Sequence, residues 1–295
     1  MSVDGLIVVD KPSGMTSHDV VARIRRLAKT RRVGHGGTLD PMATGVLIIG
    51  VNKATRLLTY VIGAGKSYTA TIRLGESTLT DDAEGEVTGR APVAGVTDDA
   101  IRAGLAAQTG EIDQVPSAVS AIKINGERAY KRVRDGESVE IPSRHVTVSR
   151  LEVLDIRRPA DAEVIDVDVD VTCSSGTYIR AIARDLGATL GVGGHLTALR
   201  RTAVGGLTLA VASTLEQLEE RAPDVVGLPM ADAARQAFPQ RTATVEEARV
   251  LSHGGPLEPA GIDGPYAVFD SSGALLAIVS ERDGRARAEI VLAPA

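Results

Sequence analysis

The stretch that most constrains the fold runs from residue 32 to residue 50, where a glycine-rich segment leads into an apolar run. The glycines of this segment allow positive φ and close approach of the backbone. They are Gly34, Gly36 and Gly37. Pro41 disfavours helix at the preceding Asp40, and residues 46–51 are typical of a buried strand. The sequence therefore predicts a sheet in which one carboxylate, that of Asp40, is held on a loop leading into a buried strand.

The carboxylate of Asp40 has two interpretations. It is a candidate for catalysis because loops carry functional residues disproportionately. It is also a candidate for an ordinary Asx-turn, since Asp-Pro is a common turn initiator. His35, five residues earlier, would suit an acid–base pair with Asp40, but nothing in the sequence sets their distance. Both interpretations stay open on the residues alone.

Hydrophobic periodicity predicts further strands and helices. Apolar residues alternate with polar ones over residues 68–74 and 164–171, which is the period of half-buried strands. The second of these strands has an acidic opposite face, which should not contact phosphate. Helices are predicted from Thr16 or Ser17 onward, over 101–108 and over 178–186, the last ending at Gly187.

Length and composition predict two domains with aliphatic cores. The chain has 295 residues, of which 43% are hydrophobic but only 2% aromatic, so the core must be built from Val, Ile, Leu and Ala. After about residue 229, prolines and glycines separate short apolar strands. We therefore predict a boundary near residue 234, with a larger domain over 1–233 and a small, mostly β module over 234–295.

Cysteine use and the N-terminal sequence bear on cellular location. Cys173 is the single cysteine, which excludes an internal disulfide and a cysteine-based zinc site and fits a reducing cytosol. The first apolar run is short and flanked by acids, so we predict neither a signal peptide nor a transmembrane helix. A cytoplasmic protein with no membrane contact is expected.

Charge is distributed unevenly along the chain. The overall net charge of −5 argues against a nucleic-acid partner, yet residues 1–66 hold ten basic and four acidic residues. Just before the Asp40 loop, six basic residues fall within ten positions without an acid: Arg23, Arg25, Arg26, Lys29, Arg31 and Arg32. Such a run is often only a solvated face, but beside a candidate active site it favours a polyanion. Phosphate contacts are expected from Arg25, Arg26, Arg31 and Arg32.

Other charged positions also call for explanation. Residues 81–86 form an acidic loop that is either a hydrophilic connection or a metal site, although it lacks metal-ligand spacing. Residues 199–205 are predicted as a compact basic turn, and residues 114–134 as a basic segment around Tyr130 that contacts RNA. Arg180 lies in the first turn of a predicted helix, where the helix dipole disfavours it unless a carboxylate is there to meet it.

The Asp40 loop resembles the signature loop of the TruB-type pseudouridine synthases in the segment GHGGTLDPMATGVL, residues 34–47. These enzymes isomerise one uridine in the T arm of tRNA. The resemblance implies that Asp40 is the catalytic nucleophile and that Gly36, Thr38 and Leu39 are supporting motif residues. It also implies an α/β (α+β) fold, in which a mixed, largely antiparallel sheet with flanking helices precedes a small PUA-like RNA-binding module.

Further motifs of the same family follow in order. Lys66-Ser67-Tyr68 resembles its active-site tyrosine motif, so Tyr68 would stack on uracil and serve as the base at C5. Residues 173–180 resemble the second signature, in which Arg180 pairs with Asp40 and keeps it ionised. The remaining roles implied are Tyr178 and Leu199 in the uracil pocket, His35 on the T loop, Lys11 and Pro12 supporting the Tyr68 strand, and Cys173 as structural.

A thumb-like region is expected over residues 114–140. Residues 114–123 resemble the mobile thumb segment of the family. Ser117 and Val119 stand where the usual pattern has a proline and a tyrosine, so this chain departs from the family at a position used for stacking.

The implied reaction sets its own requirements. Converting uridine to pseudouridine breaks the N1–C1′ bond and forms a bond from C5 without redox change, so neither a cofactor nor a metal is expected. It needs a nucleophilic carboxylate, a base for C5 and a pocket for a base taken out of the stack. We expect guide-independent synthesis at position 55 of tRNA, with the T stem-loop as partner and no obligate protein partner.

Three other functions stay open at this point. The chain could be an RNA-binding folding helper for the T arm without essential catalysis. It could be an RNA-guided synthase acting on ribosomal RNA. It could also be a metal-dependent hydrolase that uses His35, Asp40 and residues 81–86, although no pair there has recognisable metal spacing.

Overall fold

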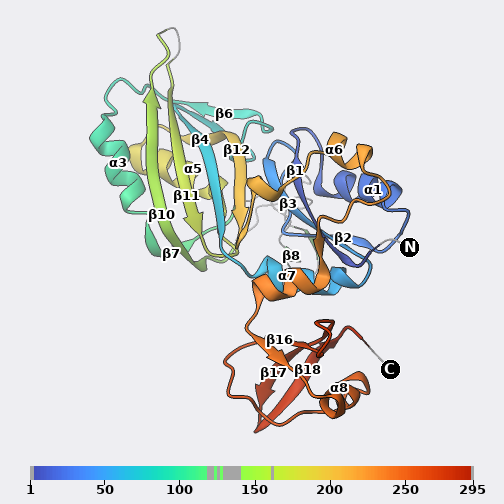
Figure 1. Cartoon of the computed structure of the whole chain (residues 1–295). Helices are drawn as coiled ribbons and strands as arrows, with labels where there is room; N and C mark the ends of the chain where they lie inside the picture. The colour runs from blue at the N-terminus through green and yellow to red at the C-terminus, as the bar shows by residue number, and fades with distance from the viewer. Residues whose placement is uncertain (1–2, 118–122, 125–126, 129–140, 161–162, 294–295) are drawn as a thin grey trace.

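The computed structural model describes residues 3–117, 123–124, 127–128, 141–160 and 163–293, which form a large sheet, a smaller sheet and two two-stranded sheets, with flanking helices (Figure 1). The larger sheet has ten strands, and its pairings are antiparallel except that β3 runs parallel to β12. Its main order is β14 (Leu228–Pro229), β1 (Gly5–Lys11), β3 (Thr44–Val51), β12 (Gly194–Val204), β4 (Lys66–Leu74), β11 (Ile165–Cys173), β10 (Arg144–Arg157) and β7 (Gly110–Gln114), with β2 (Val33–Gly36) on β3 and β13 (Leu207–Thr208) on β12. The predicted mixed, largely antiparallel sheet is confirmed.

Helices flank this sheet, and α3 and α5 pack together on one face of it (Figure 1). The α-helices are α1 (Ser17–Leu27), α2 (Leu58–Ile62), α3 (Asp98–Ala106), α5 (Ile179–Leu190), α6 (Leu215–Glu220) and α7 (Met230–Ala237), with 3₁₀ turns at Asn52–Leu57 and Leu209–Val211. Two further antiparallel pairs are formed by β5 (Glu76–Thr78) with β6 (Val87–Arg90) and by β8 (Lys123–Ile124) with β9 (Glu127–Arg128). Within the described part of the chain, no helix is long and apolar enough to cross a membrane.

The predicted start of α1 is confirmed, and the predicted end of α5 is wrong. Thr16 is the N-cap of α1 and forms a capping box with Asp19. Helix α5 does not end at Gly187 but continues to Leu190, and Gly191 closes it at φ +71°. Gly187 serves packing instead, because a Cβ there would lie 2.2 Å from the backbone of Gly193 and Gly194.

Two charge predictions need correction. Residues 199–205 are not a basic turn, since all but the last belong to β12. The acidic face of β11 is not free negative charge, because neighbouring strands place arginines on it. Asp166 binds Arg73 at 2.8 Å, and Asp168 pairs with Arg157. Strand β11 lies between β4 and β10, so arginines on both neighbouring strands neutralise its acidic face.

A second, smaller sheet forms the C-terminal module. It has the order β15 (Gln240–Thr242), β16 (Tyr266–Phe269), β17 (Leu275–Arg282) and β18 (Arg285–Val291), and α8 (Val245–Ser252) packs on it. Residue 234, the predicted boundary, lies inside α7, and the chain passes from that helix into β15 at Gln240. The Tyr60 hydroxyl of α2 donates to Glu289 of β18 at 2.6 Å, which ties the module to the first domain.

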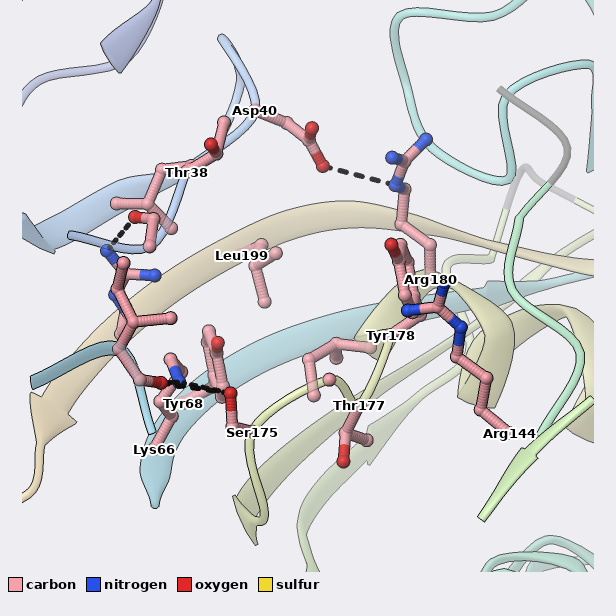
Figure 2. A pocket seen from close by; sticks show the side chains of 16 residues that line it. Thr38, Asp40, Lys66, Tyr68, Arg144, Ser175, Thr177, Tyr178, Arg180 and Leu199 are labelled. Carbon is pink, nitrogen blue, oxygen red and sulfur yellow. Dashed lines mark hydrogen bonds and ion pairs between the residues drawn. The ribbon is translucent and has the colours of Figure 1, made fainter. Parts of the chain in front are cut away.

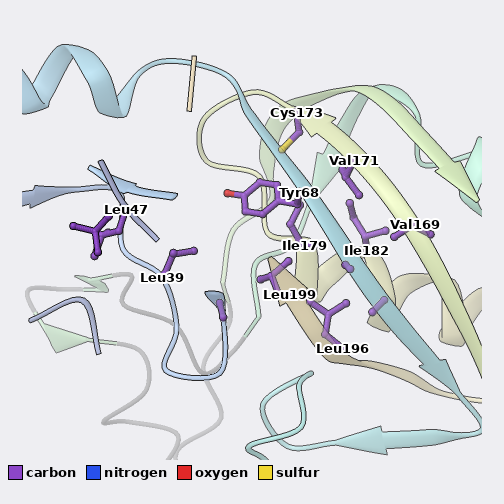
Figure 3. Close-up of a cluster of buried hydrophobic side chains, with 14 of the residues drawn as sticks. Leu39, Leu47, Tyr68, Val169, Val171, Cys173, Ile179, Ile182, Leu196 and Leu199 are labelled. Carbon is purple, nitrogen blue, oxygen red and sulfur yellow. The ribbon is translucent and has the colours of Figure 1, made fainter. Parts of the chain in front are cut away.

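The core of the larger domain is aliphatic, as the composition predicts (Figure 3). Side chains from β4, β11, β12 and α5 meet there, among them Ile182, Val169 and Leu196, all fully buried. Tyr68 borders this cluster and is 6% exposed. The core therefore continues directly into the place where the predicted base lies.

Candidate functional site

A cavity of about 430 Å³ lies where the Asp40 loop meets β4, β12 and the first turn of α5 (Figure 2). It brings together most of the predicted pocket residues, since Thr38, Leu39, Asp40, Tyr68, Tyr178, Arg180 and Leu199 all line it. Three separate stretches of sequence thus supply the carboxylate, the phenol and the guanidinium. The predicted grouping of Asp40, Tyr68 and Arg180 around one cavity is confirmed.

The Asp40 loop is pinned on both sides of the carboxylate. Before it, the backbone N–H of Leu39 donates to Ser17 Oγ at 2.9 Å, and Ser17 Oγ donates to the Leu39 carbonyl at 3.0 Å. After it, the buried Lys11 Nζ donates to the carbonyl of Pro41 at 3.1 Å. Gly37 opens the loop at φ +76°, a conformation that glycine adopts at little cost. Two anchors and a glycine turn therefore fix where Asp40 points.

The contacts of Lys11 are with the Asp40 loop rather than with the Tyr68 strand, and the predicted role of Pro12 stays a prediction. Besides Pro41, Lys11 Nζ donates to the carbonyls of Pro12 at 2.9 Å and Met15 at 2.6 Å. All three acceptors belong to the first loop or to the Asp40 loop, so Lys11 supports Asp40 rather than the Tyr68 strand. Gly36 also lies in a strand rather than a turn, with Leu58 of α2 at 3.3 Å from an added Cβ.

Arg180 bridges two carboxylates. Its Nε lies 3.1 Å from Asp40 Oδ2, its Nη1 lies 3.2 Å from Asp82 Oδ2, and Nη1 also donates to the carbonyl of Thr80 at 2.8 Å. The predicted Arg180–Asp40 ion pair is confirmed, as is the need for an anion at the start of α5. The guanidinium divides its prongs between Asp40 and Asp82, which the sequence did not suggest.

Opposing influences act on the pKa of Asp40. Burial raises the pKa of Asp40, the charge of Arg180 lowers it, and the charge of Asp82 raises it again. Burial outweighs the charge of Arg180, so the pKa of Asp40 lies above its ordinary value, and Arg180 acts against that rise in the direction expected. The carboxylate is 38% exposed, against 8% for its arginine, so it is the reachable member of the pair.

The first two acids of the loop over residues 81–86, Asp81 and Asp82, belong to the site, whereas Glu84 and Glu86 are exposed as in a hydrophilic connection. Asp82 is 2% exposed, and its Oδ1 accepts the backbone N–H of Glu84 at 3.0 Å. Asp81 lies 3.5 Å from Arg184, one turn along α5 from Arg180. Two consecutive acids therefore hold two arginines of one helix. Within the described residues, no group of three or more His, Cys, Asp or Glu side chains is arranged to hold a metal ion.

Tyr68 occupies the floor of the cavity beside two buried cations. Burial raises the pKa of Tyr68 to about 12, and the neighbouring charge of Arg201 opposes that rise. Lys66 lies in the same strand, and its Nζ donates to the carbonyls of Ile62 at 2.9 Å and Ala64 at 3.1 Å. At neutral pH the phenol is therefore protonated in the free protein.

Tyr178 and Leu199 complete the walls of the cavity. The side chain of Gln114, at the end of β7, grips the Tyr178 backbone, accepting its N–H at 2.7 Å and donating to its carbonyl at 3.1 Å. Tyr178 is also the N-cap residue of α5, so this clamp fixes the turn that presents Arg180. The predicted thumb-like region lies largely outside the described residues, including Val119 and Tyr130.

Several predicted residues lie away from the cavity. His35 does not line it and instead packs edge-on against His18, with ring centroids 5.2 Å apart. Burial lowers the pKa of His35, so the ring favours its neutral form. The four predicted phosphate contacts are exposed on the end of α1 and the segment after it: Arg25, Arg26, Arg31 and Arg32. An acid–base pair of His35 with Asp40 is therefore not supported by the described contacts.

Sequence reasoning missed three charged residues of the site. Asp82 was hidden in an acidic run that resembles a solvated loop, and Arg201 in a basic run. Lys66 stands in the tyrosine motif but carried no role. Cys173 is 3% exposed, and burial raises its pKa, in agreement with a structural role.

Comparison with known proteins gives a consistent family. The model of the TruB family pseudouridylate synthase N-terminal domain matches residues 25–179. The tRNA pseudouridylate synthase B C-terminal domain matches 180–224, and the tRNA pseudouridine synthase II C-terminal model matches 238–293. The tRNA pseudouridine synthase B of Arthrobacter sp. (strain FB24) is 58% identical, with 99% of this chain and 97% of that protein covered. That of Thermobifida fusca (strain YX) is 55% identical, with 98% and 99% covered.

Solved structures agree on the fold. A chain of the archaeal box H/ACA sRNP Nop10–Cbf5 complex matches with a TM-score of 0.72 and 27% identity, covering 98% of this chain and 86% of that one. A chain of an H/ACA RNP bound to a substrate RNA matches with a TM-score of 0.71 and 26% identity, covering 98% and 85%. Motifs, cavity geometry, family models and relatives thus converge, and the chain belongs to the TruB family of pseudouridylate synthases.

Proposed function

We propose that this chain is a guide-independent tRNA pseudouridine synthase that isomerises the uridine at position 55, in the T arm, with Asp40 as nucleophile. The observation that carries the proposal is the Asp40 carboxylate held 3.1 Å from Arg180 at a cavity whose floor is Tyr68. A nucleophile must be accessible and oriented, and Asp40 is the exposed member of a fixed ion pair.

The proposed reaction moves one proton from C5 to N1 of the uracil. The Asp40 carboxylate bonds to C1′ as the N1–C1′ bond breaks, and that carboxylate–C1′ bond breaks again when C5 of the uracil bonds to C1′. N1 gains the proton of the Tyr68 phenol, the C5–H bond breaks so that its electron pair restores the C5–C6 double bond, and the resulting phenolate takes the proton from C5. Arg180 holds the attacking carboxylate, and Tyr178 and Leu199 enclose the uracil. No redox partner is consumed, because bonds are only exchanged within one nucleotide.

The choice of tRNA over a guided substrate rests on the relatives. Relatives named tRNA pseudouridine synthase B are 55–58% identical over nearly the whole chain, whereas the H/ACA chains share 26–27%. We include in the proposal a cytoplasmic location and a division into domains 1–233 and 234–295, the second a PUA-like RNA-binding module. The separate sheet of that module supports the division.

The test is tritium release from a tRNA transcript labelled at uracil C5, without any guide RNA. Release should depend on a uridine at position 55 and should vanish in a transcript with cytidine there. No release by the wild-type protein would overturn the proposal, and release from other positions would overturn its T-arm part. If Asp40→Asn restored every growth and tRNA-folding defect of a deletion strain, RNA folding rather than catalysis would be the important activity.

A further inference from the structure

Arg201 is the largest side chain that is almost completely buried, and the proposed mechanism does not yet use it. It is 1% exposed and lines the cavity. It stands directly opposite Tyr68 in the antiparallel pairing of β12 with β4. Opposite residues in such a pair point to the same face of the sheet, with Cβ atoms about 5 Å apart. The backbone therefore brings the Arg201 side chain next to Tyr68.

The guanidinium of Arg201 is fixed by backbone carbonyls. Its Nε donates to Val46 at 2.7 Å and its Nη2 donates to Gly37 at 2.9 Å. These acceptors lie in β3 and at the start of the Asp40 loop, so both ends of the fork are held. Gly45 allows the backbone of β3 to lie close to the backbone of β12 at Arg201, because a Cβ at position 45 would lie 2.2 Å from the Arg201 carbonyl oxygen. The guanidinium thus has one orientation relative to Tyr68.

The charge of Arg201 is not matched by a carboxylate. Among the described residues no ion pair includes it, whereas the adjacent Arg200 binds Asp10 at 2.7 Å on the other face of the strand. Burying a cation with only neutral acceptors is costly. The group beside it that is able to become an anion is the phenol of Tyr68. Of these two neighbouring arginines, Arg200 is therefore structural and Arg201 faces the site.

We propose that Arg201 is a positioning residue for Tyr68, which keeps the tyrosine oxygen as a hydrogen-bond acceptor and stabilises its phenolate. A guanidinium has donors only, so the phenolic hydrogen must point away from Arg201. The phenol gives this hydrogen to N1 as a proton. The phenolate that results faces the fixed positive charge of Arg201. It then takes the proton from C5 and returns to the phenol, so one proton moves from C5 to N1.

Other charged groups around Tyr68 set the background for this effect. Arg201 lowers the pKa of Tyr68, while burial and the acids Cys173 and Asp40 raise it. Lys66 lies in the same strand and donates to carbonyls and to Ser175 Oγ at 3.3 Å. Arg201 is the largest of the influences that favour the phenolate. This inference rests on the proposed role of Tyr68 as the base, and its first test does not require activity.

The first test titrates a fluorinated tyrosine, which has a more acidic phenol, placed at position 68 of the full-length chain. The chain has no tryptophan, so phenolate absorbance is read without that background. Arg201→Met should raise the pKa of this phenol by about one unit or more, the effect of a lost neighbouring charge. Arg200→Met is the matched control and should leave the pKa of this phenol unchanged. If the pKa of the phenol were unchanged in Arg201→Met, Arg201 would only connect β12 to β3 structurally. That result would overturn the inference.

The second test is a double-mutant cycle in single-turnover tritium release. Arg201→Lys, which keeps the charge but not the fork, should slow the wild-type enzyme about tenfold or more and slow Tyr68→Phe much less. Equal losses in both backgrounds would overturn the coupling. If Arg201→Met does not fold, Arg201→Gln, which also removes the charge, replaces it in the titration and should still raise the pKa of the phenol. A wild-type enzyme without turnover, but with the titration shift present, would overturn the proposed function and not the Arg201–Tyr68 coupling.

Discussion

The arginines of the cavity and the arginines of the α1 segment carry the same charge in opposite settings. Arg180 and Arg201 are 7% and 1% exposed, and each is held by fixed acceptors. The four arginines at the end of α1 and after it are exposed, and no ion pair is found for them in the described residues: Arg25, Arg26, Arg31 and Arg32. Buried charges orient groups and shift pKa values, whereas exposed charges attract a polyanion.

This comparison divides the expected effects of mutations. A change in the cavity should alter the rate of the chemical step and leave RNA affinity nearly constant. A change on the α1 segment should alter affinity and salt dependence and leave the chemical rate constant. A cavity variant that changes RNA affinity, or an α1-segment variant that changes the chemical rate, would show that the two regions do not act separately.

The largest expected effect is that of Asp40→Asn. The amide is nearly isosteric but cannot serve as the nucleophile, so single-turnover tritium release should fall by on the order of 10⁴ or more. Its dissociation constant for tRNA should stay within about threefold, because Asp40 carries no phosphate-binding charge. The two quantities are measured with saturating enzyme and by filter binding. If Asp40→Asn lost only tRNA affinity and kept its chemical rate, the division between the cavity and the α1 segment would be wrong.

Arg180→Lys is expected to come next. An ammonium keeps the charge but cannot reach Asp40, Asp82 and the Thr80 carbonyl at once. The single-turnover rate should drop by about 10² to 10³, with tRNA affinity almost unchanged. Arg73→Lys is the matched control, since Arg73 also forks a buried carboxylate, Asp166, outside the cavity. A rate loss in that control equal to the loss in Arg180→Lys would point to a general packing defect.

Asp82→Asn should have a smaller effect that depends on pH. The charge of Asp82 raises the pKa of Asp40, and Asp40 must be ionised to attack. Activity is therefore lost as pH falls through the raised pKa of Asp40, and removing Asp82 should move this acid limb to lower pH. The plateau should fall about tenfold, because Arg180 loses one of its anchors. The pH–rate profile decides, and an acid limb that moves to higher pH would contradict the assignment.

The sequence predicted most of the elements because their residues repeat with a clear period. The alternation over 68–74 and the capping residue Thr16 are local patterns, and both elements are found. The end of α5 was misplaced because Gly187 resembles a helix stop, whereas its role depends on the contact with Gly193 and Gly194. Local periodicity in the sequence does not predict contacts between segments that are far apart in the chain.

The same limit applies to the site. Asp40, Tyr68 and Arg180 could be found because motifs mark them and because the helix dipole makes Arg180 conspicuous. Asp82 and Arg201 could not, since an acid in an acidic run and an arginine in a basic run carry no local sign of burial. Their roles come from strand register and from the loop that meets α5. Residue type shows what a charge is able to do, and the fold decides whether it is paired.

The smallest expected effect per residue belongs to the exposed arginines of the α1 segment. If each neutralises a phosphate, replacing all four by alanine should weaken tRNA binding and reduce the slope of log K against log salt by up to about four. The single-turnover rate at saturating enzyme should not change, because none of the four lines the cavity. The matched control replaces three surface arginines that already have acidic partners, Arg90, Arg150 and Arg157, and should leave the slope in place. Arg25 is expected to contribute least, since its Nη2 already donates to the carbonyl of Val33 at 3.1 Å. An unchanged salt slope in the fourfold variant would reject the phosphate contacts and leave this run as a solvated helix face.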